Sequence, residues 1–231
     1  MADNFAINWD QPDQRQFETG TDRGVLYVMS NGTYGDGVPW NGLTAVTETP
    51  SGAEASPIYA DNIKYAELRS AEEFGCTIEA YTYPEEFAVC DGSAELVSGS
   101  GLYIGQQDRA KFGFTYRTKV GNANDTSAAN DYKIHIVYGA TASPSERSYQ
   151  TVNDSPEAIT FSWEVTTTPI TVPGFKPTAI VTIQKSKANA EKFAELEAKL
   201  YGTAGDATAS PAVEEVKGAI PSIDDLLEIF G

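Results

Sequence analysis

The sequence predicts a mainly β protein of two packed antiparallel sheets, a β-sandwich or barrel, with one flanking α-helix and a short C-terminal helix. Three observations predict this. Several segments alternate apolar and polar residues with the period of two that half-buried strands show. Turn-forming residues separate these segments, among them most of the 20 glycines and 12 prolines. Apolar residues take up helical spacing only near the end of the chain.

The first third of the chain alternates between strands and turn-rich connections. Residues 1–23 are polar with scattered apolar positions, and we expect an extended or irregular arm there. A strand is expected at 24–29, and the Asn-Gly and Asp-Gly pairs within 30–42 predict a long hairpin or ordered loop. Further strands are expected at 43–49 and 62–68, joined by a connection that contains proline and glycine.

The middle of the chain shows the clearest alternation. One face of the strand expected at 72–84 carries apolar side chains, namely Phe74, Cys76, Ile78 and Ala80. One face of the strand expected at 111–118 likewise carries apolar side chains, namely Phe112, Phe114 and Tyr116. The strand at 131–139 places Tyr132, Ile134, Ile136 and Tyr138 on one face, and Lys133 and His135 on the other. We therefore expect His135, the only histidine, to face solvent.

Residues 119–131 have the composition of a loop. The strand expected at 158–169 directs its large apolar residues inward, namely Phe161, Trp163 and Val165. Glu164 then points outward, as Glu79 does on the strand at 72–84. A last strand, at 178–184, completes about eight strands, enough for two packed sheets.

The period then changes to that of a helix. Phe193, Leu196 and Leu200 define a helix at 188–201, with Asn189 or Ser186 as its cap and Gly202 as its end. Residues 203–212 read as a flexible connector. The final segment pairs Ser222 with Asp225 in a capping box and carries an apolar stripe of Ile223, Leu226, Leu227 and Phe230. Three regions result: an arm at 1–23, a β domain at 24–202, and a linker with a helical segment at 203–231.

Composition limits the partners. The chain has 33 acidic and 16 basic residues and a net charge of -17, and its first 100 residues hold 17 acids and 4 bases. A field of this sign repels nucleic acid and anionic lipid, so attachment to DNA by attraction is not expected. The N-terminus has no basic start and no apolar run, and no segment is long and apolar enough to span a membrane. We expect a protein made and kept in the cytoplasm.

No set of residues predicts catalysis, a cofactor or a metal. The neighbouring Glu85 and Glu86 would diverge on a strand or turn, so they do not form the carboxylate pair of a glycosidase. His135 has no second imidazole for a zinc site and no partner for a nucleophilic triad. Cys76 and Cys90 match no zinc spacing and are expected as small buried thiols or as one disulfide.

An ordered series of segments resembles the major tail tube proteins of long-tailed, non-contractile bacteriophages, the siphovirus type. It runs from about residue 22 to residue 202 and includes "DRGVLYV", "GVPWNGLTAVTETPSGAEASPIYADNIKY", "EEFGCTIEAYTYPEEFAVCDGS", "YIGQQDRAKFGFTYRTKVGN", "YKIHIVYGATASPSERSYQTVNDSPEAITFSWEVTTTP" and "KPTAIVTIQ". None of these segments is a catalytic signature. Residues 203–231 resemble the family less closely.

The resemblance implies a β-sandwich subunit that forms hexameric rings, stacked into a hollow tube through which the DNA genome leaves the virion. It implies that the subunit is no enzyme and needs no cofactor. Its partners would be copies of itself, a tape measure protein inside the tube, and terminator and distal tail proteins at its ends. DNA would pass without specific binding, no membrane would be involved, and assembly would take place in the cytoplasm of the host bacterium.

Two groups of residues are candidates for roles in such a tube. Glu79 and Glu164 are expected to line an acidic lumen that DNA does not adhere to. Loops at 30–62 and 118–131 are expected to reach the next ring. Aromatic residues are expected to supply area for subunit contact or ring stacking, namely Trp40, Tyr59, Tyr81, Tyr83 and Phe87. Replacing Trp40 with alanine is then expected to impair polymerisation and leave the monomer folded.

Two alternatives remain open from the sequence. One is another phage structural role, as a tail-terminator ring or a head-decoration protein. The other is a carbohydrate-binding β-sandwich, possibly a hydrolase, in which tyrosine and tryptophan side chains stack on sugar rings. Long hollow tubes in the electron microscope would favour the tube protein, and a monomer that binds glycan would favour the second alternative.

Overall fold

The computed structural model describes residues 15–123, 131–151, 154, 157–205 and 214–231. Within them the fold is mainly β, with a nine-stranded antiparallel sheet and two α-helices. The predicted fold class, a mainly β protein of packed antiparallel layers with flanking helices, is confirmed. The two layers are parts of one continuous sheet.

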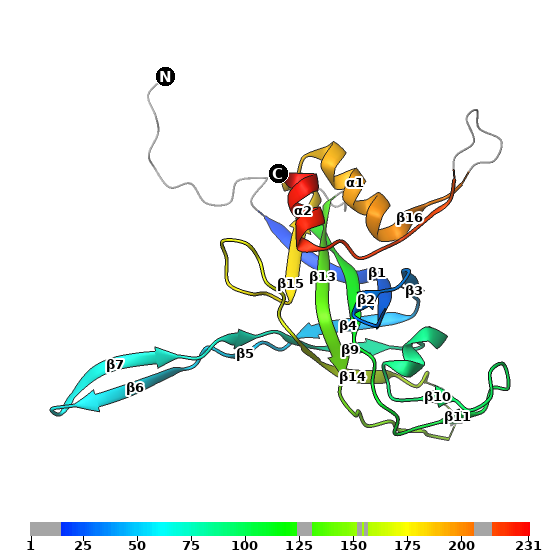
Figure 1. Ribbon diagram of the computed structural model, residues 1–231, viewed down its shortest axis with the longest axis horizontal. Coiled ribbons are helices and arrows are strands. Elements are labelled where there is room, and N and C mark those ends of the chain that lie inside the picture. Colours follow the sequence, from blue (N-terminus) through cyan, green and yellow to red (C-terminus); the bar gives the residue numbers. More distant parts are fainter. Residues whose placement is uncertain (1–14, 124–130, 152–153, 155–156, 206–213) are drawn as a thin grey trace.

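The large sheet has the strand order β2-β1-β12-β13-β14-β9-β4, with β3 beside β1 and β15 beside β13. Its strands are β1 (Gln16–Ser30), β2 (Thr33–Tyr34), β3 (Val38–Trp40), β4 (Leu43–Glu48), β9 (Gly75–Ala80), β12 (Phe112–Asn122), β13 (Asp131–Ala142), β14 (Phe161–Thr167) and β15 (Ile180–Gln184). In Figure 1, β4, β9 and β14 run across the direction of β13 and β15, so the sheet folds over on itself.

Two features of the strand pairing explain why the sheet folds over on itself. β13 and β14 pair only at their ends, where Ala140–Ala142 lie opposite Val165–Thr167, and so the two strands diverge beyond that point. β3 pairs with β1 while β4 pairs with β9, so the turn at Asn41 and Gly42 joins the two halves of the sheet. Gly42 takes a φ of 77°, a left-handed conformation that glycine adopts without strain. The folded sheet encloses an inner core.

The inner core is dominated by aromatic side chains. Trp40 lies with its ring centroid 4.6 Å from that of Phe87, 5.5 Å from Phe114 and 5.6 Å from Trp163. The Trp40 indole N–H donates to the carbonyl oxygen of Thr82 at 3.0 Å. Tilted and edge-to-face rings at these distances stabilise a core beyond the area that they bury. The core therefore fixes how the two layers of the sheet pack.

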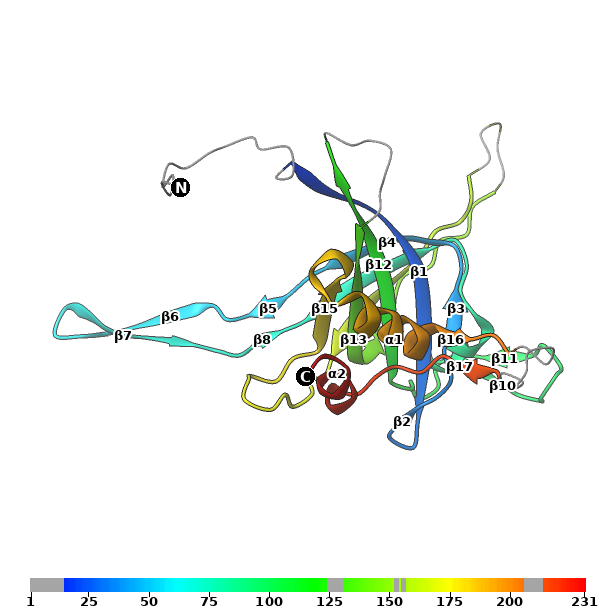
Figure 2. The ribbon, with the colours of Figure 1, turned by 90° about the horizontal axis from the view of Figure 1, so that it is seen from above.

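A second core lies on the other face of the sheet, under α1 (Ala190–Tyr201) and α2 (Ile223–Phe230). Figure 2 shows α1 crossing over the strands β1, β12 and β13, and both helices pack on side chains of β1 and β13. Asn189 caps α1, Gly202 follows its end, and Ser222 and Asp225 form the capping box of α2, as predicted. Leu226 and Ile229 are the buried residues of α2, whereas Leu227, expected in its apolar stripe, is 51% exposed.

Two buried tyrosines tie this second core to the helices. The Tyr27 hydroxyl donates to the carbonyl oxygen of Leu200 at 2.7 Å, and the Tyr138 hydroxyl donates to that of Pro221 at 2.9 Å. The first bond satisfies a carbonyl of the last turn of α1, which has no partner within the helix. The second fixes the residue that precedes the cap of α2. The two bonds therefore join the helices to the face of the sheet that they cover.

Several expectations require correction. Residues 16–23, expected within an extended or irregular N-terminal arm, are extended and pair as part of β1, because Gln16 lies opposite Asn122 on β12. β12 consequently continues to Asn122 and β13 begins at Asp131, where a loop at 119–131 was expected. The rest of the arm and of that loop, residues 1–14 and 124–130, lie outside the described residues, as do residues 206–213 of the expected linker. The division of the chain into three regions stays a prediction.

His135 does not face solvent as expected, because both faces of β13 are covered. It is 7% exposed, and its ring stacks on that of Tyr116 at 4.5 Å. Its nitrogens lie 2.9 Å from the hydroxyl of Thr118 and 3.1 Å from that of Thr182. Burial lowers the pKa of His135, so the ring is held neutral.

Cys76 and Cys90 are both free and buried, which decides between the two expectations in favour of buried thiols. Burial raises the pKa of each thiol to about 12. Because the thiolate is the reactive form, neither cysteine is chemically reactive in the folded protein.

Candidate assembly surfaces

A two-stranded ribbon extends from the body of the molecule (Figures 1 and 2). From here on we call this ribbon the arm, and it is distinct from the N-terminal segment 1–23. It consists of β5 (Ser51–Gly52), β6 (Ala55–Ala60), β7 (Ile63–Arg69) and β8 (Glu72–Glu73). β5 pairs with β8 and β6 pairs with β7. Its tip is the turn at Asp61 and Asn62, whose φ angles of 51° and 62° are those of a tight hairpin turn.

The outer part of the arm, β6 and β7, is amphipathic. Residues directly opposite in an antiparallel pair point to the same side. Ser56 lies opposite Leu68, Ile58 opposite Ala66 and, beyond a register shift after Ile58, Ala60 opposite Ile63. This face of β6 and β7 is therefore apolar except for Ser56. The other face carries an ion-pair network of Lys64, Glu67 and Arg69.

The apolar face of the arm is not covered by any described residue of the chain. Ile58 is 44%, Ile63 63% and Leu68 59% exposed. A two-stranded ribbon without a third strand or a supporting helix is only marginally stable in water. Exposed apolar side chains gathered on such an element are typical of a surface that meets another protein. The arm is therefore the strongest candidate for an assembly surface.

Only the first half of the arm, up to Asn62, falls within the loop 30–62 expected to reach the next ring, and the ribbon itself was not predicted. Sequence reasoning placed a strand at 62–68 and read the preceding residues as a connection. The sequence does contain a hairpin signal, the turn-forming pair Asp61-Asn62 between the apolar Ile58 and Ile63. Pro57 argued against a strand before this turn, because proline in a sheet is found only at edge positions such as this one.

The outer face of β4, β9 and β14 is a second candidate surface. Its side chains form two cross-strand rows, the first of Thr47, Thr77 and Glu164, the second of Ala45, Glu79 and Ser162. These strands contain no lysine or arginine. Glu164 is exposed and Glu79 is half-buried. We call this the acidic face; α1 and α2 lie on other strands and do not cover it.

The aromatic candidates divide into two groups. Trp40 and Phe87 are 3% and 0% exposed, so the expectation that they contact another subunit is wrong for this fold. Tyr83 is half-buried, with edge-to-face contacts to Phe161 at 5.3 Å and Trp163 at 5.4 Å. Tyr59 and Tyr81 are 68% and 54% exposed. Only these two are fully available for contact.

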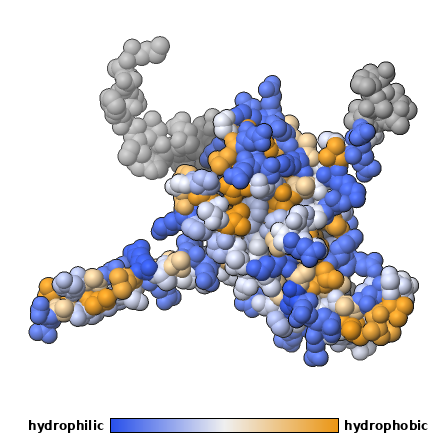
Figure 3. All heavy atoms as spheres, in the orientation of Figure 1, coloured by the Kyte–Doolittle hydropathy of each residue, from blue (hydrophilic) through white to orange (hydrophobic). Residues whose placement is uncertain are grey.

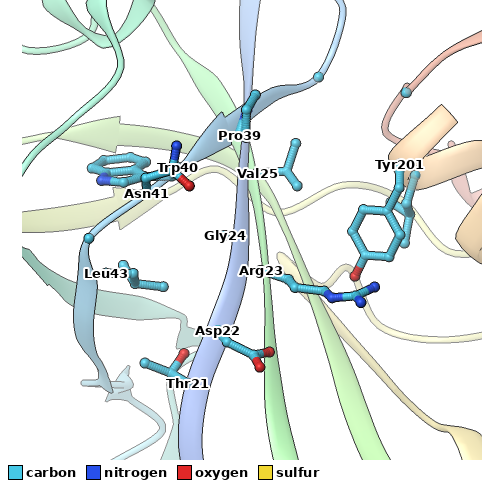
Figure 4. Close-up of a pocket in the computed structure, with 14 residues that line it drawn as sticks. Thr21, Asp22, Arg23, Gly24, Val25, Pro39, Trp40, Asn41, Leu43 and Tyr201 are labelled. Atoms are coloured by element: carbon cyan, nitrogen blue, oxygen red, sulfur yellow. The ribbon is translucent and has the colours of Figure 1, made fainter. Parts of the chain in front are cut away.

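A hollow lies between β1, the β3–β4 corner and the end of α1 (Figure 4). Its carboxylate, Asp22, accepts hydrogen bonds from the Arg117 guanidinium at 2.6 and 2.8 Å, which lowers the pKa of Asp22. Arg23 extends toward the Tyr201 ring, 5.9 Å from its centroid. The only carboxylate on the wall is thus engaged in an ion pair, and this hollow offers no acid and base pair for catalysis.

Two further findings concern the described part of the chain. No group of three or more histidine, cysteine, aspartate or glutamate side chains there is arranged to hold a metal ion. None of its helices has the length and apolar content needed to cross a bilayer.

No protein-family model matches this chain, and no curated protein compared with it is similar. Among solved structures, it is similar to the sheath/tube terminator of an extracellular contractile injection system, PVC, determined by cryo-EM in the extended state. The identity is 13%, the TM-score is 0.29, and the match covers 77% of this chain and 99% of the other. A superposition this weak carries no argument about function.

Proposed function

We propose that this chain is the structural subunit of a tail tube of the siphovirus type, polymerised as stacked hexameric rings. The observation that carries the proposal is the arm. No described residue of the chain covers its apolar face, which is unfavourable in a monomer and is what contact between subunits of a polymer needs. The ordered segments that resemble tail tube proteins are the reason for proposing a tube of stacked rings and not another kind of polymer.

The acidic face supports the second half of the proposal, that the lumen of the tube is negative. It consists of threonine, serine and small residues with Glu79 and Glu164, and its three strands contain no basic residue. Repeated around a ring, such a face repels a phosphate polymer. DNA would slide along it without specific binding.

On this proposal the partners are further copies of the chain, a tape measure protein inside the tube, and terminator and distal tail proteins at its ends. The subunit is assembled in the host cytoplasm and ends in the tail of the virion. It acts without a cofactor and has no enzymatic activity.

Negative-stain electron microscopy of the concentrated full-length protein tests the proposal. Hollow tubes with six-fold cross-sections are expected. Isolated rings, or particles that bind only to capsids, would instead indicate a terminator or head-decoration role. A monomer at every concentration that binds glycan on its exposed tyrosines would indicate the carbohydrate-binding alternative.

A cryo-EM map of the tubes tests the lumen separately. The carboxylates of Glu79 and Glu164 are expected to face the bore. A map that places both on the outer wall would reject this assignment even if the tube itself forms.

A further inference from the structure

A second ribbon, at the other end of the molecule, also presents an uncovered apolar face. We call it the short ribbon; it consists of β10 (Ala94–Glu95) and β11 (Tyr103–Ile104) with the turn between them. Ala94 lies opposite Ile104, and the backbone N–H of Leu96 donates to the carbonyl oxygen of Leu102 at 2.8 Å. Ala94, Leu96, Leu102 and Ile104 therefore share one face.

Most of that face is open to solvent. Leu96 is 58%, Leu102 53% and Ile104 37% exposed. Figure 3 shows apolar residues on the surface of the arm and of the end that carries the short ribbon, in addition to those over the middle of the molecule. Both ribbons thus have one apolar face that the described residues leave uncovered.

The short ribbon is held in shape by its polar face. The Glu95 carboxylate accepts from the backbone N–H of Gly99 at 3.0 Å and of Gly101 at 2.9 Å. On the same face, the Tyr103 hydroxyl donates to the Glu85 carboxylate at 2.6 Å. These bonds fix the turn and anchor the ribbon to the 3-10 helix Glu85–Val89. Its apolar face is therefore presented on an ordered support, which lowers the entropy cost of binding.

Local charge does not oppose contact between the two ribbons. Lys64 and Arg69 lie on the polar face of the arm and both pair with Glu67 there. The surroundings of the short ribbon are acidic, with the exposed Glu85 and Glu86. Over residues 55–69 the acidic and basic side chains balance, so the arm approaches an acidic neighbour without the repulsion that a net charge of -17 imposes elsewhere.

The two ribbons cannot meet within one molecule, because they project from opposite ends of its longest axis (Figure 1). We infer that the apolar face of the arm of one copy packs on the apolar face of the short ribbon of a second copy. Each copy then donates its arm to one neighbour and receives the arm of another. Such a head-to-tail contact propagates into a ring or a filament, whereas two identical surfaces that meet would close a dimer.

This inference rests on the proposed self-assembly and names the two surfaces that carry it. Site-directed disulfide cross-linking tests it. Four double variants combine Ile58→Cys or Ile63→Cys with Leu96→Cys or Leu102→Cys, all at exposed positions. The native thiols do not compete, because Cys76 and Cys90 are buried and unreactive. A disulfide forms only where the two β-carbons approach to about 4 Å.

We expect at least one of these double variants, oxidised under assembly conditions, to give a ladder of covalent oligomers on a non-reducing gel. Mixing the corresponding single variants should give dimers and nothing larger. The matched control is Lys64→Cys with Leu102→Cys, in which the arm cysteine lies next to Ile63 but on the polar face. It should yield no ladder.

Three outcomes would overturn the inference. Dimers from Ile58→Cys or Ile63→Cys alone would show that arms pair with each other. A ladder from the polar-face control equal to that of the double variants would show random collision. Tubes in the electron microscope with no cross-link in any of the four double variants would place the contact elsewhere, and the proposed tube function would survive. Absence of tubes from the native protein would instead contradict that function.

A second measurement does not depend on cysteine geometry. Leu102→Asp should raise the concentration needed for assembly by about tenfold or more, since it introduces a charge into the apolar contact. Its unfolding midpoint should equal that of the native protein, because Leu102 is exposed in the monomer. Normal assembly by this folded variant would overturn the inference.

Discussion

Trp40 shows how much one residue contributes to the inner core. It contacts Phe87, Phe114 and Trp163, and its indole N–H is bonded to the Thr82 carbonyl. We predict that Trp40→Ala lowers the free energy of unfolding by about 3–5 kcal/mol, because it leaves a cavity between the two layers of the sheet. Denaturant unfolding followed by fluorescence or circular dichroism measures this.

The control for that variant is a tyrosine close to it in the fold, since the backbone N–H of Tyr81 donates to the carbonyl oxygen of Gly42 at 2.8 Å. Tyr81→Ala removes a side chain that is 54% exposed and should change the free energy of unfolding by no more than about 0.5 kcal/mol. A Trp40→Ala monomer as stable as the native one would contradict the packing described here. It would also restore the expectation from sequence that Trp40 acts between subunits.

His135 is predicted to make stability depend on pH. Burial lowers its pKa below the ordinary value of 6.5, and the nearby Glu48 and Glu18 oppose that shift while Lys133 adds to it. Below pH 6.5 the unfolded chain therefore binds a proton that the folded chain does not, so stability rises with pH there. The contribution of His135 is complete above pH 6.5 and is lost as the pH falls below it.

Chemical unfolding of the native protein and of His135→Gln between about pH 5 and pH 8 measures this contribution. The native protein should lose stability toward the acidic end more steeply than the variant. Carboxylates that titrate in the same range affect both proteins alike, so the difference reports the imidazole. Equal slopes would show that His135 accepts a proton without cost in the folded protein.

The arm and the body are separable elements. We predict that replacing residues 53–71 with a short glycine-containing turn leaves the free energy of unfolding of the body within about 0.5 kcal/mol of the native value, because the arm adds nothing to either core. The same variant should form no tubes. Calorimetry or denaturant unfolding measures the first effect and electron microscopy the second. A destabilised body would show that the arm has a structural role in the monomer.

Sequence pattern predicted the elements whose two faces differ. The strand with Cys76 and Ile78 and the helix with Phe193 and Leu196 were placed well, because burial of one face leaves a period in the sequence. It could not predict the burial of His135. Alternation separates two faces but does not tell whether a distant part of the chain covers the second one.

Candidate surfaces were predicted less completely than the elements. Aromatic residues near turns, such as Trp40, looked like contact residues, yet the fold of the sheet brings Trp40 inside. Strand alternation put Glu79 and Glu164 on the face away from the inner core, where Glu164 is exposed and Glu79 is half-buried. That this face lines a lumen stays a prediction. The two amphipathic ribbons were missed, since pairing across a hairpin, not spacing along the chain, creates their apolar faces.

At the scale of the whole molecule, charge opposes the assembly that the ribbons favour. Every subunit carries a net charge of -17, so copies repel one another over the Debye length, about 10 Å at 0.1 M salt. The inferred ribbon contact would be apolar and local, and salt does not weaken such a contact. We therefore predict that the critical concentration for tube formation falls as salt is raised from about 0.02 M to about 0.3 M. Sedimentation of the polymer at each salt concentration measures it.

Substitutions on the acidic face test whether charge repulsion at this face causes the predicted salt dependence of tube formation. Glu79→Gln with Glu164→Gln removes two negative charges from each subunit while keeping the size of both side chains and one acceptor oxygen on each. If the acidic face lines the lumen, these charges converge in each ring, so the double variant should polymerise at lower concentration and respond less to salt. Matched removal of Glu72 and Glu73, exposed at the base of the arm, should have a smaller effect. Polymerisation that salt weakens would mean that attraction between opposite charges, and not the apolar ribbons, holds the subunits together.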